Sequence, residues 1–438
     1  MWPSLNLPSI KVMVVFISVL ALVIIVSLRL LSFSAGKPAR IGYVGDYEEV
    51  CGWSWQEVYI HLHHSIMSGK RHGKYIVAIP VKAGLADVLH GYISAFLWAL
   101  ISERAFLVER VDRLDDDTQR TIEFAYHPLY INWTSPSLHR DIYECLLPPY
   151  DGGCSNPPSV GHATFNGKEA VSFRQVEGVN GGFTEEFDKV DLIDKYHEDD
   201  ILLTASNRGT TYRIFDNPYH QHYLKNVLKL TPQTAFPCLF HLLFQMNKDV
   251  CDESCMQVAR KLQHAGQNPK FIRIAMHVRD PDLRHGGTNA PEHFYCADSL
   301  IEHYKQQGLR VVLVLVTASA TLQSHARHKY GDILLLPSGE PKQVEVVHDR
   351  PGKRRTREET EELDRRGVMD SARDFYILSL TDIQILSPRS GFGVVGSMMA
   401  LKKKHIMYHL KLKGEKRQCA MKPEGDELSV FADEWSGI

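Results

Sequence analysis

The sequence has almost no net charge and few cysteines for its length of 438 residues. A formal charge of -2 gives no overall electrostatic footprint for nucleic acid. Eight cysteines are too few for a fold built on disulfides. No internal repeat or long low-complexity segment is present, which excludes a collagen-like or disordered chain. A hydrophobic content of 44% is enough to bury ordinary cores, and the length allows two domains.

One long uncharged run lies near the N-terminus. Residues 12–28 read VMVVFISVLALVIIVSL, and two leucines after Arg29 bring the run to about the 20 residues that span a bilayer. The run exceeds the ~7–15 apolar residues of a cleaved signal peptide, and no small-x-small cleavage site follows it. The sequence therefore predicts a cytoplasmic tail over 1–11, a transmembrane anchor over 12–31 and a stem over 32–50.

The side of the membrane on which the body lies has to be inferred from features other than the flanking charges. More basic residues follow the run than precede it, so the positive-inside rule does not favour a lumenal body. Asn132, however, opens an Asn-Trp-Thr glycosylation sequon, and the cysteines are even in number. Cys251 and Cys255 lack a second pair at metal-ligand spacing, so a disulfide between them, or a separate bridge from each, is favoured over zinc. We therefore expect a lumenal body, glycosylated at Asn132.

Apolar segments of strand and helix type alternate along the chain. YIVAIP at 75–80, a helical pattern from 85 to about 102 and AFLV at 105–108 predict a β-α-β unit. Before it, Trp55, Tyr59, Leu62 and Ile66 recur at helical spacing. In the second half, strand-like segments fall at 272–278, 311–316, 333–337, 383–386 and 405–409, with helical stretches near 298–307, 320–329, 371–380 and 392–402. This alternation predicts a doubly wound parallel sheet and hence an α/β fold.

Polar residues follow several of these strands. HVRDPD at 277–282 leaves the end of one strand, and the arginine fork of Arg279 suits a diphosphate because it can engage two oxygens at once. The turn at Gly84 brings Asp87 and His90 to the carboxyl end of the first sheet, where open α/β folds place their ligands.

The segment SGFGVVG at 390–396 contains the spacing Gly-x-Gly-x-x-Gly. A nicotinamide-dinucleotide site would open the first β-α-β unit and be followed about 20 residues later by an acidic residue. Here the segment lies near the C-terminus and is followed by basic residues. We therefore interpret it as a helix start near Gly391 that offers free N–H groups to an anion. Gly391 and Gly393 belong to this interpretation, whereas Gly396 is expected to serve helix packing.

Three blocks of the chain resemble the conserved motifs of the fucosyltransferase superfamily, in the same order and at about the same separations. They are GLADVLHGYISAFLWALISERAFLV at 84–108, IAMHVRDPD at 274–282 and DFYILSLTDIQILSPRSGFGVVGSMM at 374–399. The superfamily includes the plant xyloglucan-type α-1,2-, the α-1,6- and the protein O-fucosyltransferases. The third block is most similar to the plant-type members, and Asn-Arg-Gly at 207–209 and Pro-Cys-Leu-Phe at 237–240 also resemble that branch.

The resemblance implies a GT-B-like fold, with two Rossmann-like domains facing a cleft behind the single transmembrane helix. We expect an acceptor-side α/β domain at 51–265 and a GDP-fucose domain at 266–438. The implied activity is an inverting, metal-independent transfer of fucose from GDP-fucose to a glycan or glycoprotein, without a cofactor or a nucleic-acid partner. The implied location is the Golgi membrane, as a single-pass type II protein with a lumenal catalytic body.

The resemblance also implies site residues. The donor-binding residues are His277, Arg279, Asp282, Asp382, Ser387, Ser390, Gly391, Phe392 and Gly393. The acceptor-side residues are Gly84, His90, Asn207 and Arg208. Arg279 is expected to stabilise the charge that develops on the leaving diphosphate. The catalytic base stays open between Glu292 and Asp87, since either carboxylate would have to reach the acceptor hydroxyl.

Two departures from the family pattern keep other functions open. Many members carry Gly-Asn-Arg where this chain has Ala-Asp-Val at 86–88, and α-1,6 enzymes carry two arginines where it has Arg-Asp at 279–280. One alternative is a catalytically inactive, membrane-anchored glycan-binding protein of the same fold. Another is a metal-dependent glycosyltransferase that uses the three aspartates at 115–117 to hold a cation with another nucleotide sugar.

Overall fold

The computed structural model describes residues 47–79, 83–109, 122–134, 160–165, 168–177, 187–279, 290–337, 356–388, 390–410 and 425–432. All of these belong to one compact unit, Gly42–Ile438. The tail, the anchor and most of the stem lie outside the described residues, as do the aspartates at 115–117 and Asp282. Within the described ranges, every helix is too short or too polar to cross a bilayer.

The first sheet has five strands in the order β2-β1-β6-β5-β4. The strands are β1 (Tyr75–Ala78), β2 (Ala105–Val108), β4 (Val160–Phe165), β5 (Lys168–Glu177) and β6 (Ile201–Ala205). β2, β1, β6 and β5 pair in parallel, and β4 joins β5 as an antiparallel partner. Helix α4 (Leu85–Ile101) connects β1 to β2, which confirms the predicted β-α-β unit. All four residues of β1 are buried, as is typical of a parallel strand covered on both faces.

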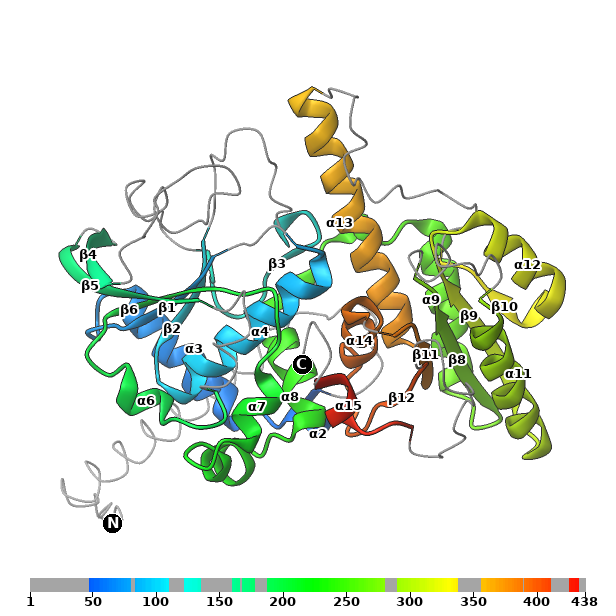
Figure 1. Cartoon of the computed structure of the whole chain (residues 1–438), viewed down its shortest axis with the longest axis horizontal. Helices are drawn as coiled ribbons and strands as arrows, with labels where there is room; N and C mark the ends of the chain where they lie inside the picture. Colours follow the sequence, from blue (N-terminus) through cyan, green and yellow to red (C-terminus); the bar gives the residue numbers. More distant parts are fainter. Residues whose placement is uncertain are drawn as a thin grey trace, which may run out of the picture. The chain divides into compact units, whose positions relative to one another are not determined.

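The second sheet has the order β10-β9-β8-β11-β12 and is parallel throughout. Its strands are β8 (Phe271–His277), β9 (Arg310–Val316), β10 (Leu334–Leu335), β11 (Ile383–Leu386) and β12 (Ile406–His409). The connecting helices are α11 (Pro291–Gln306), α12 (Ala320–Tyr330), α13 (Arg357–Ser379) and α14 (Gly391–Met398). This confirms the predicted doubly wound sheet (Figure 1).

The strand order of the second sheet has one reversal. The chain passes from β8 outward to β9 and β10, and then returns to the other side of β8 as β11. β8 and β11 are therefore neighbours, and their last residues, His277 and Leu386, are register partners. Open α/β sheets bind their ligands at such a switch point, outside the carboxyl ends of the strands.

Helix α3 (Ser54–Met67) covers the outer edge of the first sheet. The Phe106 N–H of edge strand β2 donates to the Tyr59 hydroxyl at 3.0 Å, and the His63 Nε2–H donates to the Phe106 carbonyl at 3.1 Å. Two side chains thereby satisfy main-chain groups that an edge strand leaves unpaired. Burial lowers the pKa of His63 to about 4, so this histidine is a neutral packing residue.

Helix α8 (Pro232–Leu243) connects the two halves of the chain. It begins with a capping box between Thr231 and Thr234. A disulfide between Cys238 and Cys51 ties it to α2 (Tyr47–Cys51). Toward the second sheet, the His241 Nε2–H donates to the Met399 carbonyl at 2.8 Å. The segment that the sequence places between the two α/β units is therefore a buried helix.

The remaining elements are short or lie at the periphery of the sheets. They are β3 (Tyr126–Pro128), β7 (Phe244–Met246), α6 (Leu192–Lys195), α7 (Thr211–Asp216), α9 (Glu253–Gly266), α15 (Leu428–Ala432), a π-helix (Tyr223–Val227) and 3-10 turns at Ile122–Phe124, Lys248–Val250 and Gly331–Ile333. A disulfide joins Cys251 to Cys255, as the spacing favours, and Cys296 is also disulfide-bonded. The domain boundary expected at 265–266 falls in the last turn of α9 and stays a prediction.

Candidate functional site

The Ser387 hydroxyl makes three hydrogen bonds at the switch point. It follows β11 directly, and its hydroxyl donates to the His277 carbonyl at 3.2 Å. The hydroxyl has one hydrogen, so its other two contacts are donors to it: the Arg279 N–H at 3.0 Å and the His293 Nε2–H at 3.1 Å. Ser387 thereby fixes the main chain of Arg279 at the point where the chain leaves β8.

Helix α14 starts at this same point. Its N-cap is Ser390, whose side chain makes no capping hydrogen bond. The Ser390 hydroxyl is buried and has no hydrogen-bond partner among the described residues. The first N–H groups of an α-helix have no partners inside the helix and carry its positive dipole end. The start of α14 can therefore bind an anion at the carboxyl ends of β8 and β11.

Gly393 lets α14 approach the strand ends closely. A Cβ on Gly393 would lie 2.8 Å from Leu386 Cδ2 and 3.1 Å from His277 Nδ1. A Cβ on Gly396 would instead lie 2.6 Å from Leu378 Cδ1 on α13, so Gly396 serves helix packing, as expected from the sequence. Only the first of these two glycines adjoins the switch point.

The His277 ring forms one wall of the site. It stacks on Phe392 with ring centroids 5.0 Å apart and an interplanar angle of 15°, and Phe375 of α13 packs on the same phenylalanine at 4.4 Å. Burial, together with the neighbouring His293 and Arg279, lowers the pKa of His277 to about 3. The ring is therefore neutral, and its Nδ1 has no hydrogen-bond partner in the described ranges.

His90 comes to the start of α14 from the other half of the chain. It lies on α4, which packs against α14, and its ring contacts Phe236 edge-on at 5.6 Å. Burial lowers the pKa of His90 to about 4, while the adjacent main chain of Gly391 acts in the opposite direction. Neither ring nitrogen makes a hydrogen bond of normal geometry with the described residues. His90 is thus placed at the predicted anion site.

The other acceptor-side residues and the candidate base Asp87 lie at the start of α4 or on the loop after β6. Gly84 is the N-cap of α4, and Asp87 lies in its first turn. Asn207 and Arg208 belong to the loop after β6, which crosses α4 closely. A Cβ on Gly91 would lie 2.2 Å from the Ser206 carbonyl oxygen, and Thr210 N–H donates to Ser94 Oγ at 2.8 Å. Gly84 and Asp87 thus lie at the start of α4, and the loop that holds Asn207 and Arg208 packs against the same helix.

Asp382 is not brought to the other donor-site residues. It precedes β11 and so lies at the amino end of the strand, about 13 Å of strand away from Ser387. There Asp382 Oδ2 accepts from Arg273 Nε at 2.9 Å and from Arg273 N at 3.0 Å. Half-buried Lys402 lies 3.7 Å from the same carboxylate. The structure gives Asp382 an ion pair that joins β8 to β11.

The two candidate bases lie on helices from different halves of the chain. Glu292 is in the first turn of α11, directly before His293, which contacts Ser387. Asp87 is one turn before His90 on α4. Glu292 is therefore one residue away from a side chain of the site, and Asp87 is one helical turn away from another. Asn132, by contrast, is exposed, and its Oδ1 accepts from Thr134 N–H at 3.1 Å outside the switch point.

His293 is a site residue that the sequence analysis missed, and Asp374 is a titratable residue one position before Phe375, which contacts the site. His293 is nearly fully buried and reaches Ser387 from α11. Asp374 precedes Phe375 on α13, and burial raises the pKa of its carboxyl to about 7, against the opposing effect of Arg373. The sequence carried a signal for Asp374, which opens the third motif block. His293 has no such signal, because its role depends on the packing of α11 against β11.

No group of three or more metal-ligating side chains gathers within the described ranges. No protein-family model and no curated protein matches the chain. Solved structures do match. The fold is similar to that of FUT1 from Arabidopsis thaliana, a fucosyltransferase solved as a point mutant in complex with GDP. The identity is 14% and the TM-score 0.50, over 85% of this chain and 78% of that one.

Two more distant structures are also fucosyltransferases. NodZ from Bradyrhizobium matches at 13% identity and a TM-score of 0.43, over 79% of this chain and 97% of its own. POFUT1 in complex with GDP matches at 11% identity and a TM-score of 0.35, over 75% and 94% of the two chains. The chain is therefore a mixed α/β protein with parallel sheets and a GT-B-like fold of the kind found in FUT1.

Proposed function

We propose that this protein transfers fucose from GDP-fucose to a glycan or glycoprotein acceptor. The observation that carries the proposal is the meeting of Arg279, Ser387 and the start of α14 at the switch point of the second sheet. A diphosphate needs both a cationic fork and an array of N–H donors, and this point offers the two together. The similarity of the fold to that of FUT1, which was solved with GDP, supports the choice of nucleotide.

The proposed chemistry places charge stabilisation on the leaving group. Cleavage of the bond between fucose and the β-phosphate leaves negative charge on GDP, which Arg279 and the first N–H groups of α14 would stabilise without reorganising. Ser387 would act as a positioning residue, since it holds the Arg279 main chain. The buried His277 ring, packed on Phe392, would shape the wall beside the phosphates.

Inversion requires a base that takes the proton of the acceptor hydroxyl as that oxygen attacks the sugar. Asp87 and Glu292 are the proposed candidates, because each adjoins a side chain that reaches the site. The proposed reaction uses no metal ion. Retained activity in EDTA would support this part of the proposal, and loss that Mn²⁺ restores would favour the metal-dependent alternative.

We also propose that the protein resides in the Golgi membrane as a type II protein, anchored by residues 12–31. The apolar run and the exposed sequon at Asn132 support this placement. A lumenal body should carry a glycan at Asn132 whose mass a glycosidase removes. The variant Asn132→Gln should lack this mass, which tests the lumenal orientation directly. An unchanged mass would place the body on the cytosolic side or leave the sequon unused.

The nucleotide specificity is tested by thermal unfolding of the full chain with GDP, GDP-fucose, UDP and CMP. A ligand that binds the folded state stabilises it by RT ln(1 + [L]/Kd), about 2.7 kcal/mol at a hundred times Kd. Stabilisation by GDP and GDP-fucose alone is expected. Equal stabilisation by UDP or CMP would contradict the assigned donor, whereas binding of GDP-fucose without turnover would favour the inactive glycan-binding alternative that the Ala-Asp-Val sequence at 86–88 suggests.

A further inference from the structure

Three buried side chains around the start of α14 have polar atoms without a hydrogen-bond partner among the described residues. These atoms are both ring nitrogens of His90, the hydroxyl oxygen of Ser390 and Nδ1 of His277. His277 is the most exposed of the three residues, at only 5%. Buried polar groups in folded proteins are nearly always hydrogen-bonded, because otherwise they lose water without a replacement. Three such side chains at one helix start therefore point to a ligand that brings polar atoms of its own.

His90 reaches this helix start from the first half of the chain. It lies in the second turn of α4, and α4 packs against α14. Its ring adjoins the main chain of Gly391, the first residue of α14. The Phe236 ring of α8 meets the imidazole edge-on at a centroid distance of 5.6 Å. The imidazole is therefore held beside the first turn of α14 by packing against two other helices.

The His90 ring is suited to binding an anion without carrying a charge itself. Burial lowers its pKa to about 4, so the imidazole is neutral and has one N–H donor and one acceptor nitrogen. A neutral donor can stay buried in the free protein at far less cost than a lysine or arginine, whose charge would lose its water. The ring can therefore donate a hydrogen bond to an anion that the first N–H groups of α14 attract.

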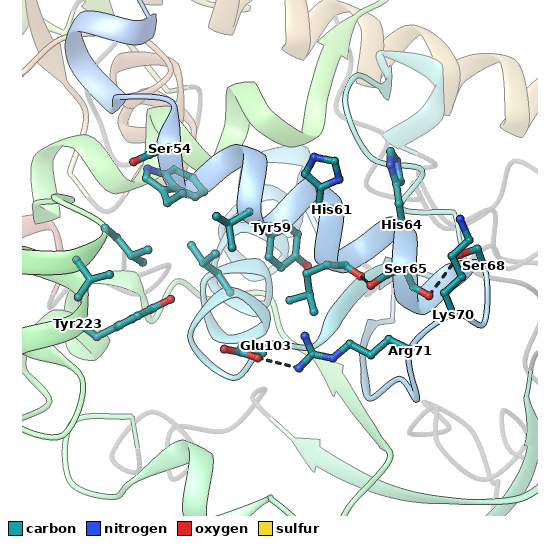
Figure 2. A pocket seen from close by; sticks show the side chains of 16 residues that line it. Ser54, Tyr59, His61, His64, Ser65, Ser68, Lys70, Arg71, Glu103 and Tyr223 are labelled. Atoms are coloured by element: carbon teal, nitrogen blue, oxygen red, sulfur yellow. Dashed lines mark hydrogen bonds and ion pairs between the residues drawn. The ribbon is translucent and has the colours of Figure 1, made fainter. Parts of the chain in front are cut away.

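The pocket along α3 does not explain these unpartnered atoms. It has a volume of about 840 Å³ and is lined by α3, the residues just after α3, the end of α4 and the π-helix (Figure 2). On α4 it reaches Leu100, which lies about 15 Å of helix beyond His90. Neither His90 nor His277 nor Ser390 lines it. A ligand of these three side chains would therefore bind at the start of α14, where the proposed diphosphate site lies.

The origin of His90 in the first half of the chain selects the part of the donor that it contacts. That half is expected to hold the acceptor, so its side chains face the end of GDP-fucose that consists of the fucose and the β-phosphate. Of these two groups only the phosphate is an anion, which a helix N-terminus attracts. We propose that His90 donates a hydrogen bond to the β-phosphate, so that both halves of the chain hold the leaving group. This inference rests on the proposed donor, and it moves His90 from the acceptor side to the donor site.

The test compares the binding of GDP and GMP to the full chain by isothermal titration calorimetry, since GMP lacks the β-phosphate. His90→Leu removes the N–H donor and should raise the Kd for GDP about 10- to 100-fold, the range expected for a hydrogen bond to a charged group. The Kd for GMP should be the same in the parent and in His90→Leu. His90→Gln keeps a side-chain N–H donor and should restore most of the affinity for GDP.

Urea unfolding without nucleotide separates ligand binding from a structural role. His90→Leu replaces two unsatisfied nitrogens by an apolar side chain of similar size, so the midpoint urea concentration should not fall. His63→Leu is the matched control, because His63 is also buried and neutral but its Nε2–H donates to the Phe106 carbonyl at 3.1 Å. That variant should lower the midpoint and leave the Kd for GDP unchanged.

Several outcomes would overturn the proposal. One is an equal Kd for GDP in the parent and in His90→Leu, as expected if a water molecule satisfies the ring. Another is an equal loss of affinity for GMP and GDP, because the effect would then not lie at the β-phosphate. Failure of His90→Leu to fold would show that the ring serves the structure. Absence of GDP binding by the parent would instead refute the proposed donor itself, so the two failures are distinguishable.

Discussion

At the scale of single residues, the candidate site depends on close approach. Gly393 lies in contact distance of both strand ends, and Ser387 joins the main chain of Arg279 to His277 and to His293. There is no room for an added methyl group at Gly393. The Ser387 hydroxyl already uses its one hydrogen and accepts two hydrogen bonds. Substitutions at these two residues therefore report on the geometry of the site rather than on general packing.

Gly393→Ala should distort the start of α14. The added Cβ would lie 2.8 Å from Leu386 Cδ2, so the helix has to shift or the strand end has to repack. Overpacking of this kind typically costs 1–3 kcal/mol, and stabilisation by GDP should fall as well. Gly367→Ala is the matched control, because nothing lies within 4 Å of a Cβ there. That control should be neutral or stabilising by up to ~1 kcal/mol; equal effects of the two variants would refute the steric account.

Ser387→Ala should remove the partner of two buried donors, Arg279 N–H and His293 Nε2–H. Leaving buried donors unsatisfied costs roughly 1–3 kcal/mol each. We expect a lower free energy of unfolding in urea and a larger KM for GDP-fucose. Ser299→Ala, which removes an exposed helix hydroxyl bonded to Tyr295 O, is the control and should change neither. A normal KM in Ser387→Ala would mean that Ser387 does not position Arg279.

Asp382 and His293 show what single-residue reasoning from sequence misses. Asp382 and Ser387 stand five positions apart in one motif block, yet β11 separates them, so one lies at the amino end and the other at the carboxyl end of the strand. The strand predicted at 383–386 already separates the two residues, whereas the motif resemblance groups both in one donor site. His293 lies outside every block, and only the packing of α11 brings it to Ser387.

At the scale of elements, the strands were predictable and the helix limits less so. The predicted strand at 383–386 is β11, and the segment at 272–278 is β8 to within one residue at each end. The helix expected near 371–380 extends back to Arg357, where Thr356 and Glu359 form a capping box. The mixed charges at 353–366 predict a solvated, partly helical face, and α13 confirms the helix from Arg357 onward. The pairing of β4 with β5 and the switch between β8 and β11 depend on long-range contacts that periodicity does not encode.

The hydrogen bonds between Tyr59 of α3 and the main chain at edge strand β2 can be tested. Tyr59→Phe keeps the buried ring but leaves Phe106 N–H and the Arg104 carbonyl without their hydroxyl partner. We expect a loss of about 1–3 kcal/mol in unfolding free energy by urea titration. Tyr295→Phe, at an exposed position, should be neutral within ~0.5 kcal/mol. If Tyr59→Phe is equally neutral, α3 does not cover the edge as described.

At the scale of the whole molecule, buried histidines make stability depend on pH. Burial lowers the pKa of His63, His90 and His405 to about 4 and that of His277 to about 3. The unfolded chain takes up protons near pH 6.5, before the folded chain does, so acid favours unfolding. The free energy of unfolding should therefore fall as pH decreases from about 6.5 toward 4, by up to ~1.4 kcal/mol per pH unit and group.

Asp374 acts in the opposite direction at higher pH. Its folded pKa of about 7 lies above its ordinary value, so the folded chain holds a proton that the unfolded chain has lost, and stability falls as pH rises from about 4 to 7. The four histidines outweigh this one carboxyl, so urea titrations between pH 4 and 8 should show a free energy of unfolding that rises from pH 4 and levels off above about pH 7. His63→Gln keeps a donor near Phe106 and should make the acid limb shallower. A free energy of unfolding that increases as the pH is lowered below 6 would contradict the assignment of neutral histidines.

In the proposed reaction, Arg279 at the carboxyl ends of β8 and β11 stabilises the leaving GDP. The most direct test of this role is the rate of fucose transfer from GDP-fucose by the full chain and by Arg279→Ala. Arg310→Ala serves as the control, because Arg310 lies exposed at the amino end of β9 in the same sheet. We expect kcat/KM to fall at least ~100-fold in Arg279→Ala and to be unchanged in the control. A near-normal rate in Arg279→Ala would contradict this role.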